Sequence, residues 1–279
     1  MSNISNLKDF KGEELFLEIG KIYEENEKSR ESFLRKLIHT TNKKAFFTID
    51  ELGRVKRKEG NYILFSALYE TDEKFLRYFQ SQMDFSEQDS LKDDSLSRIQ
   101  NIDTTTIKKN IIKLIVNGKI EYGIKYLYEL YKRDGEEFFK FISEIVLMDN
   151  MDSEKSLYIY SMKEYFEKFG YSLEVFYFVM SYITKLRFDL YEYEYENICI
   201  DENITKECLR ERFNSNKEKY NNIQGLKVLG YLSLLEKYEY INEKKYMNIL
   251  KERMDKVEKL ENTEKLKDIK EVIFEILSK

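Results

Sequence analysis

The chain has 279 residues, a net charge of −5 and a hydrophobic fraction of 42%, so it is long enough and apolar enough to bury a core. The negative charge excludes proteins that are basic over their whole surface, while local basic segments remain open. Proline and tryptophan are absent and alanine occurs only at positions 45 and 67, a bias typical of an AT-rich bacterium or its mobile elements. The absence of proline also suits long uninterrupted helices.

The sequence indicates a cytoplasmic protein without a membrane segment. The two cysteines, Cys199 and Cys208, have no spacing that forms a disulfide framework or a zinc site, which fits a reducing compartment. Residues 1–10 are polar and lack the apolar stretch of a signal peptide. The most apolar run, residues 175–183, is much shorter than the roughly 20 residues that span a bilayer, so we expect a buried core helix there.

The N-terminal part predicts several short helices. Apolar residues recur at helical spacing over residues 13–25, again around residues 33–37, and after residues 71–72. Residues 45–65 are ambiguous. Thr48 and Glu51 have the spacing of a capping box, which favours a helix from Thr48 to about Glu59. Alternatively, residues 45–49 and 62–65 pair as a β-hairpin.

An acidic, serine-rich linker is predicted at residues 85–103, where no apolar period is present. A clear helical pattern follows from Thr104. The predicted stops and starts in this central part are glycines and capping side chains, namely Asn117–Gly118, Asp134–Gly135, Ser153, Gly170 and Ser172, the last of which begins an apolar helix through Phe188.

Residues 190–200 alternate tyrosine with glutamate, which predicts a short strand or an extended connector. Four helices of even length are then expected at residues 204–219, 222–238, 242–258 and 262–278. Their starts are about 20 residues apart, which is typical of αα-hairpins. The sequence therefore predicts an all-α fold of helical hairpins divided into an N-terminal portion (1–84), a linker (85–103), a central part (104–200) and a C-terminal part (201–279).

Residues 111–135 resemble a tetratricopeptide hairpin. Gly118 would mark the turn between the two helices, and Gly123 would take the small position where they cross. The proline that ends the family's repeat is absent, and no second copy matches well. The resemblance, which extends to HEAT-like hairpins, implies a helical array with a concave surface that binds a peptide or protein.

The usual signatures of catalysis are missing. His39 is the only histidine, which excludes sites with two or more histidine ligands, and no phosphate-binding or nucleotide-binding glycine motif is present. Glu243 and Lys245 have the E-x-K form of carboxylate-metal nucleases, but the pattern around them is helical. We therefore predict no catalytic residue, no metal and no cofactor.

A basic segment is the first candidate binding site. Between Arg30 and Glu59, nine Lys and Arg stand against four Asp and Glu, a local charge of +5. Its core consists of the following residues: Lys43, Lys44, Arg54, Lys56, Arg57 and Lys58. Such a cluster can bind phosphates or an acidic protein, although a solvated lysine-rich face is the more common explanation.

An acidic stretch is the second candidate. Six acidic residues and no Lys or Arg lie between Asp189 and Glu202. The residues proposed to meet a basic partner are Asp189, Glu192, Glu194 and Glu196. An exposed strand face would explain the same pattern.

The function that follows from the missing chemistry and the hairpin spacing is a non-catalytic, cytoplasmic protein–protein interaction module. One alternative is a nucleic-acid-contacting regulator, or a defence or anti-defence factor, that uses residues 43–58 or 189–202. The other is a carboxylate-metal-dependent hydrolase. Another protein is the expected partner, nucleic acid is the alternative, and no membrane is expected. The oligomeric state is not indicated.

Overall fold

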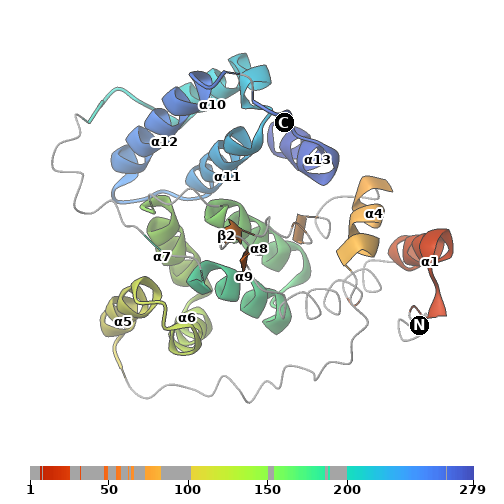
Figure 1. Ribbon diagram of the computed structural model, residues 1–279. Coiled ribbons are helices and arrows are strands. Elements are labelled where there is room, and N and C mark those ends of the chain that lie inside the picture. Colours follow the sequence, from red (N-terminus) through yellow and green to blue (C-terminus); the bar gives the residue numbers. More distant parts are fainter. Residues whose placement is uncertain are drawn as a thin grey trace. The chain divides into compact units, whose positions relative to one another are not determined.

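The computed structural model describes residues 7, 9–25, 32, 47–49, 55–57, 62, 64–65, 73–82, 102–149, 154–185, 188, 200–261 and 263–279. The fold is all-α, as predicted. Eleven α-helices lie in these residues, and successive helices within one compact unit pack antiparallel (Figure 1).

The chain divides into two compact units. One consists of Met1–Ser97 and Ser161–Lys185, and the other of Arg98–Tyr160 and Leu186–Lys279, so the division falls within helix α8 (Lys155–Phe169). Most of the linker predicted at residues 85–103 lies outside the described residues. The division of the chain into four parts stays a prediction.

In the first unit, α1 (Gly12–Glu25) packs against α4 (Glu73–Gln82), which confirms the helices predicted at both places. The two helices are joined by polar contacts as well, because the Gln80 side-chain amide donates to the Gly12 carbonyl at 2.6 Å and Arg77 pairs with Glu13 at 3.2 Å. The helix expected around residues 33–37 lies outside the described residues.

The favoured helix from Thr48 to Glu59 is wrong. Strands β1 (Phe47–Ile49) and β2 (Val55–Arg57) pair antiparallel there, with Thr48 opposite Lys56. The β-branched residues Thr48, Ile49 and Val55 favour strands over helices, and this preference outweighs the capping-box spacing. The hairpin alternative is correct in its first strand, whereas the second strand lies before residues 62–65.

The same unit contains the second part of α8 and α9 (Leu173–Lys185). Gly170 has a left-handed φ of 81° after the end of α8, and the Ser172 hydroxyl accepts a hydrogen bond from the Val175 amide at 3.3 Å, which confirms both predicted signals. The apolar run at residues 175–183 is a buried helix, also as predicted. Phe188 is not helical, so the helix ends earlier than expected. No helix in the described ranges is both long and apolar enough to cross a bilayer.

The second unit begins with three helices that pack in sequence: α5 (Thr104–Val116), α6 (Ile120–Arg133) and α7 (Gly135–Leu147). Asp103 caps α5, and Gly118 turns the chain with a φ of 64°. Asp134 ends α6 and also caps α7 by accepting from the Glu137 amide at 2.9 Å. Gly135 therefore begins a helix, whereas the sequence predicted a stop.

The remaining helices of this unit surround α11 (Ile223–Lys237). It contacts α7, α10 (Lys206–Ser215), the 3₁₀ turn η5 (Lys217–Tyr220), α12 (Glu243–Glu258) and α13 (Asp268–Leu277). Ten residues of α11 are buried, on every side of the helix, as expected for a central helix. The predicted helix at 262–278 begins only at Asp268, because the Leu266 amide bonds instead to the Asn221 carbonyl at 3.3 Å. The possible strand at residues 190–200 lies almost wholly outside the described residues.

Candidate interaction surface

Most residues of the two predicted binding segments lie outside the described residues. Lys56 and Arg57 belong to β2, where they pair with Thr48 and Phe47 of β1. The other members of the basic core, Lys43, Lys44, Arg54 and Lys58, are not described, and neither are Asp189, Glu192, Glu194 and Glu196. Both segments stay predictions.

The residues considered for chemistry are not assembled into a site. Glu243 and Lys245 begin α12, so the E-x-K pattern lies on a helix, and Glu243 forms an ion pair with Lys206 of α10. Cys208 is exposed on α10, while Cys199 and His39 lie outside the described residues. Across the ranges that the structure describes, no three His, Cys, Asp or Glu side chains are grouped closely enough to hold a metal ion.

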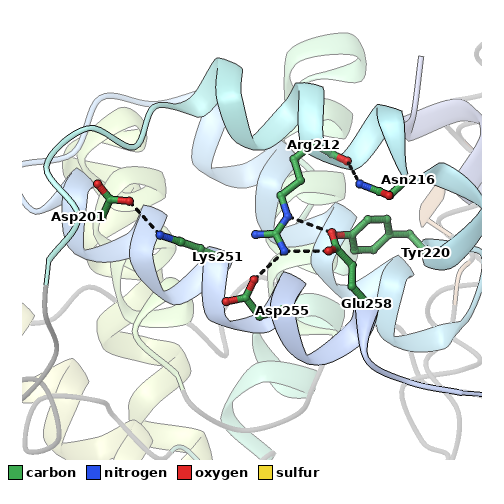
Figure 2. A network of polar contacts seen from close by, with 7 residues as sticks. All are labelled: Asp201, Arg212, Asn216, Tyr220, Lys251, Asp255 and Glu258. Atoms are coloured by element: carbon green, nitrogen blue, oxygen red, sulfur yellow. Dashed lines mark hydrogen bonds and ion pairs between the residues drawn. The ribbon is translucent and has the colours of Figure 1, made fainter.

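A network of polar contacts joins α10, η5 and α12 (Figure 2). The Arg212 guanidinium donates a hydrogen bond to Asp255 at 2.6 Å and one to each carboxylate oxygen of Glu258, at 2.9 and 3.0 Å. The Tyr220 hydroxyl donates to Glu258 as well. Lys251 pairs with Asp201 beside this network, at 2.9 Å.

The charges in this network stabilise one another. Hydrogen bonds from Arg212 hold the pKa of Glu258 below its ordinary value, and Glu258 in turn raises the pKa of Arg212. Burial, followed by the bond to Glu258, raises the pKa of Tyr220. A carboxylate held ionised by a bidentate arginine is a poor general base, so we assign the network a structural role in fixing α10 against α12.

A second cluster lies deep in the same unit. Asp149 and Lys155 form an ion pair with side chains only 2% and 1% exposed. The Lys155 ammonium also lies 3.5 Å from the ring centroid of Phe188, and Arg253 donates to the Asp149 carbonyl at 2.5 Å. A buried pair with these contacts ties the end of α7 to the start of α8 and presents no surface to a ligand.

One side of α5 is accessible to a partner. The buried residues of α5 are Ile107, Ile111 and Ile115, which all lie on one side of the helix. The opposite side carries a stripe at positions i, i+3, i+4 and i+7, and these positions share one helix face. Its members are Lys109, Ile112, Lys113 and Val116, of which only Ile112 is partly buried.

The stripe continues into the turn between α5 and α6. Val116 is 47% exposed, residues 117–119 are exposed, and Tyr122 in the first turn of α6 is 63% exposed. We call Lys109, Ile112, Lys113, Val116, Lys119 and Tyr122 the basic hairpin face. It combines cations with large apolar side chains, which distinguishes it from an ordinary lysine-rich surface.

Two other cations of the hairpin, Lys108 and Arg133, have internal partners. Lys108 pairs with Glu137 of α7 and lies 5.1 Å from the ring centroid of Phe141. Arg133 pairs with Glu129 at 2.8 Å and donates to the Ile102 carbonyl. These contacts hold α5 against α6 and α7, and they do not involve the lysines of the basic hairpin face. Within the described part of the chain, Lys109, Lys113 and Lys119 form no ion pair.

A charge count over each predicted helix would have found this face. From Thr104 to Arg133 the sequence has seven Lys and Arg against two Glu, a charge of +5 in a chain of −5. Glu129 is largely buried beside Arg133, and the capping residues Asp103 and Asp134 lie at the end of the hairpin away from the turn. Glu121 is exposed in the first turn of α6, at the turn end, so the more basic part of the hairpin is α5, which has three lysines and no acidic residue.

No protein-family model, curated protein or solved structure matches the chain. The resemblance of residues 111–135 to a tetratricopeptide hairpin thus has support only from the local geometry. Gly118 does form the turn between α5 and α6, as the resemblance implied, and Gly123 is buried in α6.

Proposed function

We propose that this protein is a non-catalytic, cytoplasmic interaction module that binds another protein through the basic hairpin face. The observation that carries the proposal is the stripe on α5, where Lys109 and Lys113 stand beside the accessible apolar residues Ile112 and Val116. Large apolar side chains on a surface are stabilised when a partner removes them from water, and adjacent cations steer that partner and fix its orientation.

The rest of the second unit supports this proposal because it supplies a rigid support for the face. Successive packing of α5 on α6, α6 on α7 and α7 on α11 connects the hairpin to the unit's core. A preorganised surface loses little conformational entropy on binding. The polar clusters around Arg212 and Lys155 are satisfied internally, and we assign them to this support.

The test compares charge reversals at two places. Lys109→Glu with Lys113→Glu changes the face, whereas Lys256→Glu with Lys259→Glu changes the net charge equally at exposed positions in and just after α12. The full chain and both variants are used to recover proteins from nuclease-treated bacterial extract, followed by quantitative mass spectrometry.

We expect the wild type and the α12 variant to recover the same protein in equal amounts. The α5 variant should recover at least about tenfold less of it, which corresponds to a loss of about 1.4 kcal/mol in binding free energy. Equal recovery by all three chains would contradict the proposal. Circular dichroism of each variant shows whether a loss comes from unfolding.

A further inference from the structure

We infer that the partner segment bound by the basic hairpin face is an acidic protein segment that carries aliphatic side chains. This inference rests on the proposed function and adds the chemistry of the partner. Three features of the face support it: the sign of its charge, the kind of apolar side chain it presents and its length.

The charge of the face is uniform where it is exposed on α5. Helix α5 contains three lysines and no acidic residue, and two of the lysines, Lys109 and Lys113, are exposed one helical turn apart. A carboxylate of the partner can meet either ammonium without a competing acidic group on the same helix. Complementary charge of this kind raises association rates and disfavours basic partners.

The apolar members select a protein segment over a nucleic acid. Ile112 and Val116 are aliphatic, and their burial requires an aliphatic or aromatic side chain in the partner. Single-stranded nucleic acids bind proteins by stacking bases on aromatic rings and arginines, and Tyr122 is the one aromatic residue of the face, which has no arginine. Two aliphatic residues are also too few to insert a helix into a membrane surface.

The net charge of the whole molecule also favours a short acidic segment over a long polyanion. The hairpin carries +5 in a chain of −5, so all other residues together carry −10. Net negative charge outside the hairpin disfavours a long polyanion or an anionic membrane as the partner. A short acidic segment meets only the face.

The length of the face sets the length of the partner segment. Along α5 the face runs from Lys109 to Val116, which corresponds to about 10 Å at a rise of 1.5 Å per residue. A helical partner segment of about two turns, or an extended one of about three or four residues, covers this distance.

The probe is a display library of random peptides about 16 residues long, which exceeds the helical length of the face. It is selected on the full chain, and peptides that also bind the Lys109→Glu/Lys113→Glu variant are removed. We expect enriched peptides that contain Asp or Glu together with Leu, Ile, Val or Met. One enriched peptide is then synthesised with its aliphatic residues intact and with all of them changed to Ser.

Binding of the intact peptide should be at least about tenfold tighter than binding of the Ser version. It should also weaken by about tenfold in Val116→Gln/Tyr122→Gln and not in Ile241→Gln/Leu260→Gln, which changes two exposed apolar residues elsewhere in the unit. None of these four substitutions changes the net charge, so the comparison of the two double variants isolates the apolar contribution to binding.

Each contrary outcome identifies what failed. Enriched peptides without acidic residues, or a Ser version that binds equally well, would overturn the acidic-aliphatic partner and leave the interaction module standing. A second contrary outcome is that no peptide binds, while single-stranded DNA or phosphatidylserine vesicles bind tightly to the wild type and not to the α5 variant. This result would assign the face to that polyanion and overturn a protein partner. Enrichment of no peptide, with neither polyanion bound, would overturn the inference and the proposed function together.

Discussion

The ammonium of Lys155 and the carboxylate of Asp149 pair in the interior of the second unit, where water reaches almost none of either side chain. Breaking a buried ion pair by removing one of its two charges typically costs about 3–5 kcal/mol. Lys155→Met should therefore lower the free energy of unfolding by about that amount in urea denaturation.

The double variant Lys155→Met/Asp149→Asn is the informative comparison. Because it removes both charges, it should be more stable than the sum of the two single changes implies, by about 1–3 kcal/mol. If the effects of the two changes simply add, the ion pair contributes no coupling energy to the folded state.

The Arg212 network predicts sensitivity to acid. The pKa of Glu258 lies below its ordinary value of 4.5, chiefly because Arg212 donates to it. A carboxyl group with a lowered pKa in the folded state stabilises that state above its ordinary pKa, and the contribution is lost as pH falls through the lowered value. Glu258→Gln should lower the free energy of unfolding by about 1–3 kcal/mol near neutral pH, and the difference from wild type should shrink below pH 4.5.

Glu264→Gln provides the control. Its pKa is lowered too, by Lys267, but the pair is fully exposed and water screens it. We expect unfolding curves that match those of the wild type at every pH. A loss equal to that of Glu258→Gln would show that net charge, and not the network, governs acid stability.

Two buried tyrosines predict that the folded state also loses stability at high pH. Burial raises the pKa of Tyr240 and of Tyr246 above the ordinary 10.0. A raised pKa in the folded state gives stability that is complete below pH 10 and is lost as the pH rises further, because the unfolded chain ionises first. Tyr246→Phe should shift the alkaline unfolding midpoint, followed by circular dichroism, to higher pH. Tyr122→Phe, at an exposed position, should leave that midpoint unchanged.

Gly225 is the residue at which we expect a single methyl group to be most damaging. A Cβ at this position would lie 1.9 Å from the Tyr220 carbonyl oxygen, which is backbone and cannot rotate away. Gly225→Ala should therefore cost about 3 kcal/mol or more in urea denaturation. It should also separate Tyr220 from Glu258, so the acid sensitivity described above should weaken in the same variant.

Gly118→Ala is the matched change at a glycine that has space. Nothing lies within 4 Å of its Cβ position, and only the φ of 64° opposes a side chain. We expect a loss of about 1–2 kcal/mol. Equal losses at the two glycines would mean that the close approach of α11 to η5 is relaxed in solution.

Sequence patterns located the helices well where their signals are local. Gly118, Gly170 and Ser172 act through the backbone within three residues, so their roles could be read directly. One error arose where a distant residue contributes to the structure. Leu266 bonds to Asn221, which no local pattern reveals, and this contact delays the start of α13.

The candidate sites also differ in how far the sequence alone could locate them. The partners Arg212 and Asp255 are 43 residues apart, so their network required a structure. The basic hairpin face was within reach of the sequence, because its charge excess lies in one predicted helix pair. The sequence prediction instead placed a binding site at residues 43–58, where six Lys and Arg lie closer together in the chain.

Helix α11 is buried on all sides by helices that come both before and after it in the chain. During synthesis, α12 and α13 follow over about 40 residues, which at ordinary elongation rates takes roughly 2–8 seconds. Throughout that interval a helix with Leu226, Leu229 and Leu232 among its interior residues lacks half of its covering. The nascent chain therefore exposes this apolar helix to aggregation between the emergence of Lys237 from the ribosome and that of Leu277.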